Sequence, residues 1–513
     1  MPLEQPGAET LAQIASNNRL GIDPADLETY HAAAGGLLQS WNVVEELYAE
    51  IAPTAPERSW TGSDDAANPL GAWYVQTEIA GASGGPLAGR RVAIKDNIAV
   101  AGVPMMNGSL TVQGYVPAGD STVVTRLLEA GAIIAGKSVC EDLCFSGGSH
   151  TAKTGPIRNP WNPARSAGGS SSGSAALVAN GDVDLALGGD QGGSIRIPSA
   201  FCGTVGHKPT FGLVPYTGAF PIEQSIDHLG PITRSVADAA QMLNVLAGPD
   251  GLDPRQPDAV VGVDYVAALG EPATGLRIGV VTEGFGLANS ETTVDDTVRA
   301  AIRTLQGAGL VCEDVSIPWH RHGAAIWDVI SVEGATWQMV EGNGYGMNWK
   351  GFYDPELIAH YGQKWRQEPA AFSETVKLVT LAGKYALQTA YGRHYAMART
   401  LEASLAAAYD TALATYDVLV MPTVPIRASV IPPAHASVEE VLGRALEMLA
   451  NTCPFDVTGH PACSVPAGLA DGLPVGLMIV GRKFDDATVL RVAHALENAV
   501  GGFPLPTMTR SNA

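Results

Sequence analysis

Lys95 and two glycine- and serine-rich segments are the parts of this sequence whose residue types suit covalent catalysis. Lys95 ends the apolar run 92–94, and Gly and Ser accumulate at 167–174 and again at 188–194. A serine hydroxyl is a poor nucleophile near neutral pH and needs a base that removes its proton. Burial disfavours the ammonium form of a lysine, so a lysine in a dry setting can be that base without a histidine. The sequence therefore predicts a site that combines serine hydroxyls with Lys95.

Taken singly, each of these segments has a simpler explanation. A lone lysine at a strand end is usually a solvated charge, and a serine in a Gly-Ser loop usually forms a turn. Residues 92–95 spell the kinase motif VAIK, but no glycine-rich loop precedes it and no HRD or DFG follows. Residues 169–173 match GxSxG, yet the preceding NPWNP is not the buried strand that a nucleophile elbow requires, and a P-loop ending is absent. Only the joint pattern predicts catalysis.

The composition predicts a globular, cytoplasmic protein. A chain of 513 residues that is 46% hydrophobic and 16% charged has enough apolar material for a large core. Its formal net charge of -21 disfavours nucleic acid and anionic membranes as partners, and no apolar stretch is long enough to span a membrane. The six cysteines and the histidines, including those at 319–322, lack metal-ligand spacing. We therefore expect no nucleic-acid or membrane partner, no cofactor and no metal.

Hydrophobic periodicity divides the chain into a helical N-terminal segment and an α/β catalytic domain. We expect residues 1–85 to be mainly helical, because apolar residues recur there at helical spacing. These residues are Leu37, Leu38, Trp41, Val44 and Leu47. Beyond them, short apolar strands such as 92–94 alternate with helical stretches such as 174–179, an order typical of α/β proteins. With no internal repeat, we expect one domain over 86–505 and a C-terminal tail at 506–513.

The joint pattern resembles the amidase signature family. The resemblance runs from Lys95 through the loops 167–174 and 189–196 to the segment 227–234, which reads DHLGPITR. It implies an α/β fold with a central mixed β-sheet that helices cover on both faces. It also implies hydrolysis of carboxylic amides to acid and ammonia through an acyl-enzyme, without a cofactor.

The resemblance also implies roles for individual residues. Ser194 matches the nucleophile, Ser170 the bridging serine on a cis peptide, and Lys95 the base. The positions that hydrogen-bond around this triad are Ser171, Asp190 and Arg196. The backbone N–H groups expected to form an oxyanion hole belong to Gln191, Gly192, Gly193 and Ser194. The residues expected to contact substrate are Phe145, Gly168, Gly169, Gln191, Ile226 and Trp327.

Amidases that accompany nitrile hydratases in actinobacteria are the subgroup most similar to this sequence. The segments that carry this similarity are 189–194 (GDQGGS), 206–215 (GHKPTFGLVP) and 342–348 (GNGYGMN). In similar enzymes the helical N-terminal segment contributes to dimerisation, so we expect a homodimer. Ser172 departs from the commoner glycine of the family, which affects loop packing more than chemistry.

Substrate choice and two alternative functions remain open from the sequence. Trp327 is the least certain pocket residue, because residues 326–330 also read as an ordinary core helix. An apolar pocket with few polar anchors predicts short aliphatic and simple aromatic amides. The first alternative is the A subunit of a glutamine-dependent amidotransferase, which the N-terminal segment and the GDQGGS sequence disfavour. The second is a catalytically silent protein of the same fold, although all three triad residues are present.

Overall fold

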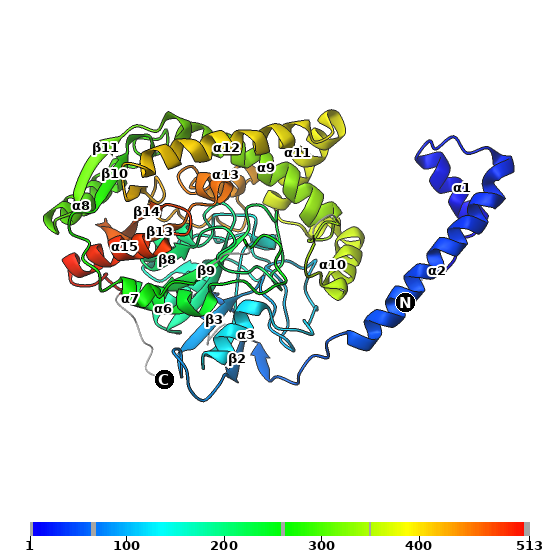
Figure 1. The fold of residues 1–513 in the computed structure, drawn as a ribbon, viewed down its shortest axis with the longest axis horizontal. Helices are drawn as coiled ribbons and strands as arrows, with labels where there is room; N and C mark the ends of the chain where they lie inside the picture. The colour runs from blue at the N-terminus through cyan, green and yellow to red at the C-terminus, as the bar shows by residue number, and fades with distance from the viewer. Residues whose placement is uncertain (1–3, 63–67, 258–261, 348–349, 507–513) are drawn as a thin grey trace. The chain divides into compact units, whose positions relative to one another are not determined.

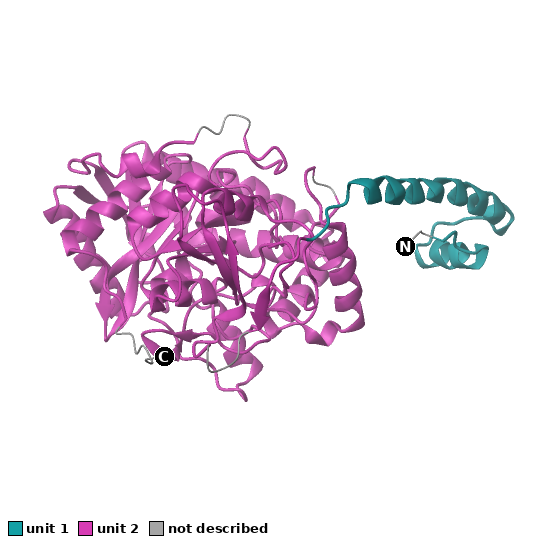
Figure 2. Ribbon diagram, turned by 90° about the horizontal axis from the view of Figure 1, so that it is seen from below, with its two compact units in different colours: residues 1–55 teal, residues 56–513 magenta. Residues whose placement is uncertain are grey.

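The structure is a computed structural model that describes residues 4–62, 68–257, 262–347 and 350–506. It divides into two compact units, Met1–Ala55 and Pro56–Ala513, which Figure 2 draws in different colours. Apart from its first residue, the predicted C-terminal tail at 506–513 lies outside the described residues.

A mixed sheet, twelve-stranded over the described residues, forms the centre of the large unit (Figure 1). Parallel pairs such as β3–β7 occur beside antiparallel pairs such as β7–β9, which confirms the predicted mixed α/β architecture. In spatial order the strands are β1 (Trp60–Gly62), β2 (Trp73–Ala80), β4 (Ile133–Ser138), β3 (Arg91–Lys95), β7 (Leu185–Asp190), β9 (His228–Thr233), β8 (Val205–Lys208), β13 (Ala462–Ala470), β14 (Leu473–Gly481), β12 (Val418–Pro422), β10 (Arg277–Val281) and β11 (Val311–Val315). A separate small sheet pairs β5 (Arg158–Asn159) with β6 (Asn162–Ser166).

Helices cover both faces of the central sheet, as predicted (Figure 1). The helices that share one core cluster with the first face are α3 (Thr122–Glu129), α6 (Val236–Leu246), α7 (Tyr265–Ala268), α8 (Thr292–Gly307) and α15 (Asp486–Val500). The helices of the second side are α4 (Ser172–Asn180), α5 (Arg196–Cys202), α9 (Gly323–Ala335), α10 (Pro355–Gln367), α11 (Glu374–Ala390), α12 (Arg393–Leu413), α13 (Val438–Leu446) and α14 (Pro454–Thr458).

Side-chain alternation along β3 and β7 decides which residues reach the second side. Successive residues of a strand point to opposite faces of its sheet. In β3, Val92 and Ile94 join the core of the first face, whereas Ala93 packs with α4 on the second. Lys95 follows Ala93 by two residues and points to the α4 side, and the same alternation in β7 places Asp190 there. Because β3 and β7 are parallel neighbours, both residues lie at one edge of the sheet.

The predicted helical segment 1–85 is too long. Residues from Trp60 to Ala80 contribute β1 and β2, and β2 pairs with β4 in the central sheet. The buried residues of β2 alternate with partly buried ones, so this segment has the period of a strand. The boundary between the two units therefore lies at Ala55, and the strands that follow belong to the large unit.

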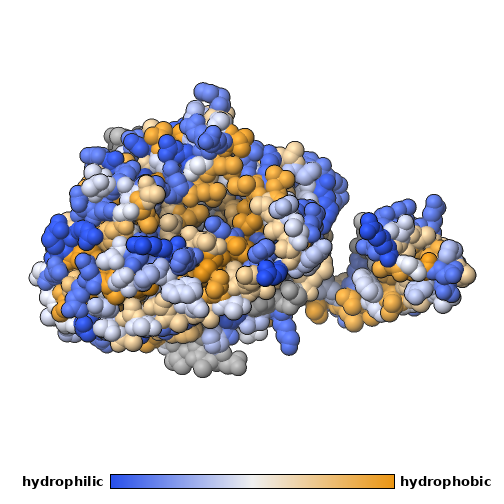
Figure 3. Space-filling view, turned by 90° about the horizontal axis from the view of Figure 1, so that it is seen from above, coloured by the Kyte–Doolittle hydropathy of each residue, from blue (hydrophilic) through white to orange (hydrophobic). Residues whose placement is uncertain are grey.

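The small unit consists of two helices with an exposed apolar surface. They are α1 (Ala8–Asn17) and α2 (Leu27–Ile51), and no residue of either helix is buried. The apolar side chains of α2 that are more than half exposed are Tyr30, Leu37, Trp41, Val43, Val44, Leu47 and Ile51. Figure 3 shows hydrophobic atoms on the surface of this unit. Among the described residues, α2 and every other helix fall short of the length and apolarity that crossing a membrane would require.

Candidate active site

Lys95 is fully buried at the end of β3, and its amine contacts two loops. Lys95 Nζ donates hydrogen bonds to Ser170 Oγ at 2.8 Å and to Gly189 O at 3.1 Å. The adjacent carboxylate, Asp96, pairs instead with Lys137 at 2.9 Å. Within the described chain Lys95 therefore forms no ion pair, and its nearest polar partner is a serine hydroxyl.

The loop before α4 brings Ser170 to Lys95 and holds the segment that carries Ser194. The peptide bond between Gly169 and Ser170 is cis. Ser171 Oγ donates to Gly189 O at 3.1 Å and accepts from the Gly189 N–H at 3.2 Å. The Ser171 N–H donates to Ser194 O at 3.2 Å. These bonds fasten the two predicted loops to each other, so the structure brings all three predicted triad residues to one place.

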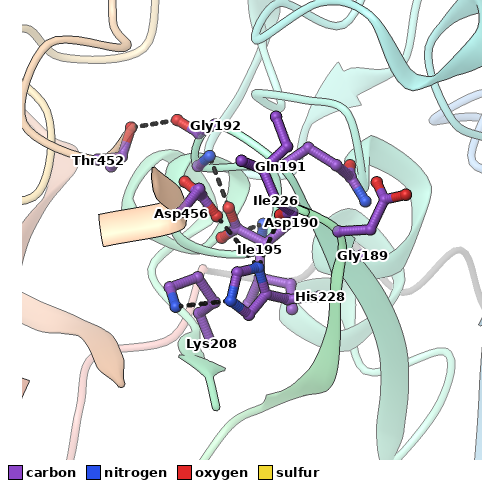
Figure 4. Close-up of polar contacts among 12 residues, drawn as sticks. Gly189, Asp190, Gln191, Gly192, Ile195, Lys208, Ile226, His228, Thr452 and Asp456 are labelled. Carbon is purple, nitrogen blue, oxygen red and sulfur yellow. Dashed lines mark hydrogen bonds and ion pairs between the residues drawn. The ribbon is translucent and has the colours of Figure 1, made fainter. Parts of the chain in front are cut away.

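Asp190 organises the turn that leads to Ser194 (Figure 4). Its carboxylate accepts the backbone N–H of Gly193 at 2.6 Å and that of Ile195 at 3.0 Å, and it accepts Nε and Nη2 of Arg196 at 3.0 and 2.9 Å. Burial by itself raises the pKa of Asp190, but the charge and hydrogen bonds of Arg196 lower it well below its usual range. Asp190 therefore remains an anion that both ends of this turn share, consistent with the predicted supporting role.

A buried charge network that the sequence reasoning did not single out continues from Arg196. Its Nη2 also donates to Asp456 Oδ2 at 2.7 Å. Lys208 Nζ lies 3.3 Å from His228 Nε2 (Figure 4). Burial and the neighbouring Asp190 raise the pKa of Asp456 well above its usual range, and burial lowers the pKa of Lys208 to about 8. Lys208 belongs to the segment 206–215 described above. Asp456 lies in the distant α14, where no local sequence pattern indicated a functional residue.

Three of the four predicted oxyanion-hole donors are free in the described structure. The backbone N–H groups of Gln191, Gly192 and Ser194 donate to no group of the described chain. The N–H of Gly193 is already committed to Asp190 Oδ1 at 2.6 Å. The expectation of four available donors is therefore corrected to three.

A mainly apolar cavity lies beside Ser194. Phe145, Ile226 and Trp327 all line it, and the Phe145 and Trp327 ring centroids are 6.5 Å apart. Trp327 Nε1–H donates to Gln191 O at 2.6 Å, which attaches α9 to the loop that carries Ser194. Trp327 is thus a wall of this cavity as well as a buried helix residue, and contact with substrate stays a prediction for all three residues.

Two glycines near Ser194 leave no room for a Cβ, and only one of them lines the cavity. A Cβ on Gly192 would lie 2.6 Å from Trp327 Cζ2, so the loop could not pass under the indole ring. A Cβ on Gly169 would lie 2.1 Å from Gly148 O. Within the described chain the cavity wall includes Gln191 and Gly192 but neither Gly168 nor Gly169, so these last two glycines serve close backbone packing here.

Comparison with known proteins identifies the family of the chain. Residues 43–490 match the amidase family. The chain belongs to the amidase family. It is 55% identical over 508 residues to an enantioselective amidase from Rhodococcus rhodochrous, covering 98% of both chains. It is 39% identical over 433 residues to the A subunit of a glutamyl-tRNA(Gln) amidotransferase from Exiguobacterium sibiricum, covering 84% of this chain and 88% of that one. The native peptide amidase of Stenotrophomonas maltophilia has a similar structure, with a TM-score of 0.66, 31% identity, and coverage of 82% and 85%.

Membership of the amidase family makes this chain an amide-hydrolysing enzyme whose substrate is a small-molecule amide. The amidotransferase protein is the more distant relative of the two. Over the residues that the structure describes, no group of three or more His, Cys, Asp or Glu side chains could hold a metal ion.

Removing the guanidinium of Arg196 from this family member is expected to be strongly destabilising. In Arg196→Met, Asp190 and Asp456 lose their shared buried cation, which costs about 3–5 kcal/mol of unfolding free energy. Arg277→Met is the matched control, because it breaks a half-exposed ion pair with Glu313 worth at most about 1 kcal/mol. Urea denaturation compares the two variants, and equal midpoints would show that the buried network does not stabilise the fold.

Proposed function

We propose that this amidase forms an acyl-enzyme on Ser194, with Ser170 and Lys95 as its proton relay. The observation that carries the proposal is the 2.8 Å contact between Lys95 Nζ and Ser170 Oγ, both fully buried, next to a cavity that Ser194 lines. A neutral lysine amine has two N–H groups and one lone pair. One N–H stays on Gly189 O, and the lone pair can take the Ser170 hydroxyl hydrogen once the direction of the resting Lys95–Ser170 hydrogen bond reverses.

In the first step Ser194 Oγ attacks the amide carbonyl carbon. Its proton passes to Ser170 Oγ while the Ser170 proton passes to Lys95 Nζ, so the relay ends as an ammonium. In the resting structure the Ser194 hydroxyl donates to no group of the described chain. Its bond to Ser170 forms when the amide enters, because catalytic hydrogen bonds often tighten only with substrate bound.

The negative oxygen of the tetrahedral intermediate is stabilised by backbone N–H groups. Those of Gln191, Gly192 and Ser194 are the free donors beside the cavity. One such donor is typically worth about 3 kcal/mol of barrier lowering. The bonds that hold the loop, from Gly193 to Asp190 and from Thr452 Oγ1 to Gly192 O at 2.6 Å, keep these donors in position before the substrate arrives.

Departure of ammonia reverses the relay. The Lys95 ammonium returns its proton through Ser170 to the amide nitrogen, the C–N bond breaks, and the acyl group remains on Ser194. Water then attacks the ester by the same relay and releases the carboxylic acid. The relay ends the cycle in its starting protonation state. No step changes an oxidation state, so the cycle needs no redox partner.

Short aliphatic and simple aromatic amides are the substrate class that we propose. Phe145, Ile226 and Trp327 give the cavity an apolar wall that suits the acyl group. Gln191 supplies a polar anchor, because its Oε1 is buried and has no partner in the described chain, while its Nε2 donates to Tyr216 Oη at 3.1 Å. This free acceptor suits the N–H₂ of a primary amide.

One assay tests both substrate class and mechanism. The purified chain alone should release ammonia from propionamide and benzamide, and added hydroxylamine should divert the acyl group to a hydroxamate. Hydrolysis without hydroxamate would argue for direct water attack. Activity on glutamine alone would favour the amidotransferase alternative.

We further propose a cytoplasmic homodimer that acts on amides formed by nitrile hydration. The exposed apolar surface of α2 supports association, because large contiguous apolar patches usually mark an interaction site. The similarity to amidases that accompany nitrile hydratases supports the metabolic role. Light scattering with the full chain and with residues 56–513 measures the oligomeric state, and a dimer that persists in the shortened chain would assign the interface elsewhere.

A further inference from the structure

Cys144 lines the same cavity as Ser194, and the mechanism above does not use it. We propose that Cys144 is a covalent attachment site for α,β-unsaturated amides, whose β-carbon its sulfur captures while the amide occupies the site. The proposal rests on the proposed function, because the amide group must first lie at Ser194. It gives the cavity a second chemistry, alkylation of the enzyme, in competition with hydrolysis.

The position of Cys144 is set by a tight turn rather than by a regular helix. Leu143 and Cys144 both have positive φ, at 47° and 59°, which non-glycine residues rarely adopt. Hydrogen bonds hold the turn, from the Leu143 N–H to Asn107 O at 3.0 Å and from the Cys144 N–H to Glu141 O at 2.8 Å. The backbone of Cys144 is thus fixed, and its side chain is held at the cavity wall.

The surroundings of the thiol favour a reactive form. Cys144 Sγ donates to Asn107 Oδ1 at 3.2 Å, and Cys140 Sγ donates to the same oxygen at 3.3 Å. Burial alone raises the pKa of Cys144, but interactions with Cys140, Lys95 and Ser170 outweigh it and lower the pKa to about 7. The thiolate, which is the nucleophilic form of cysteine, is therefore accessible near neutral pH.

The proposed addition needs no reactant other than Cys144, Lys95 and the unsaturated amide. The proton of the Cys144 thiol passes to the Lys95 amine, and the resulting ammonium is the charge that stabilises the thiolate, so the net charge of the site does not change. The thiolate sulfur then bonds to the β-carbon, the C=C π bond breaks, and the proton on Lys95 passes to the α-carbon. The product is a thioether that fills the cavity and leaves Lys95 neutral again.

The shape of the ligand explains why this thiol is reached. When Ser194 faces the carbonyl carbon of acrylamide, the β-carbon is only two bonds away, and Cys144 lines the same cavity. Other thiols lack this combination. Cys140 is fully buried and burial raises its pKa well above the ordinary value, whereas half-buried Cys312 is accessible but burial raises its pKa to about 11.

Acrylamide and propionamide form a matched pair of probes, because they differ only by the double bond. Wild-type enzyme is incubated at pH 7.5 with either amide. Its activity on benzamide is measured with time, and the masses of its peptides are measured in the same samples. We expect progressive loss of activity in acrylamide alone, with one acrylamide per chain on Cys144. Labelling of Cys144 should be roughly 10³-fold faster than that of Cys312, because thiolate content controls the rate and the two pKa values, about 7 and about 11, differ by about four. Excess propionamide should slow the loss.

Two cysteine variants and one measurement on untreated enzyme distinguish the possible outcomes. Cys144→Ser should abolish the time-dependent loss, measured relative to its own starting activity, and Cys312→Ser should retain it. If Cys144→Ser does not fold, peptide mapping of the wild type decides by itself. Hydrolysis of acrylamide without inactivation, or labelling first at another cysteine, would overturn the proposal. Ammonia release from propionamide by untreated enzyme shows whether the proposed function holds independently.

Discussion

Replacement of Ser194 with alanine is expected to reduce kcat by at least roughly 10⁴-fold while leaving the melting temperature nearly unchanged. The proposed acyl-enzyme cannot form without this hydroxyl. Little stability should be lost, because the Ser194 hydroxyl has no hydrogen-bond partner in the described chain and borders an open cavity. Ammonia release and a thermal melt of the same preparation measure the two effects.

Ser172→Ala is the matched control for this experiment. Ser172 lies in the other glycine- and serine-rich segment, 167–174, and its hydroxyl is buried without a partner in the described chain. Removing it deletes a polar group that gains nothing from burial, so both rate and stability should stay close to wild type. Residual turnover by Ser194→Ala similar to that of Ser172→Ala would refute the nucleophile assignment.

Lys95→Met is expected to lower kcat/KM by roughly 10³–10⁴-fold, because it removes the terminal proton acceptor and keeps a side chain of similar length. The lysine is fully buried and bonds Ser170 and Gly189, so its removal also takes a donor from Gly189 O and should lower the melting temperature. Ammonia release by wild type and variant is compared at one pH, with a thermal melt of each preparation.

Lys377→Met provides the comparison for Lys95→Met. Lys377 forms a partly exposed pair with Glu374 on α11, so its removal changes the same charge without touching the site. Its rate should match the wild type. If Lys95→Met kept the wild-type kcat/KM, another group would have to be the base.

Asp190 and Arg196 connect the catalytic proposal to the stability of the fold. Their buried pair is shared with Asp456 of α14, while Thr452 fixes the carbonyl of Gly192. The loop that carries Ser194, the proposed nucleophile, is therefore held by a part of the chain more than two hundred residues away. A change at α14 should consequently affect both stability and the position of the oxyanion-hole donors.

The N-terminal boundary shows where sequence periodicity was misleading. The helical spacing of Leu37, Trp41 and Leu47 correctly predicted α2, but the helical assignment was extended across β1 and β2. The alternation in β2 is short, and its pairing partner β4 lies more than fifty residues later. Strand pairing at such a distance depends on the whole sheet, which local periodicity does not describe.

The sequence by itself determined the chemistry-bearing residues, the strands β3 and β7 that end at them, and the mixed α/β class. These features depend on local residue order, because a strand's alternation and a Gly-Ser loop are properties of neighbouring residues. Only the tertiary structure decided that Trp327, Asp456 and Cys144 meet the loop of Ser194, and that Gly193 is committed to Asp190. Such contacts follow from the packing of distant elements and the competition for hydrogen-bond partners, which exist only once the chain is folded.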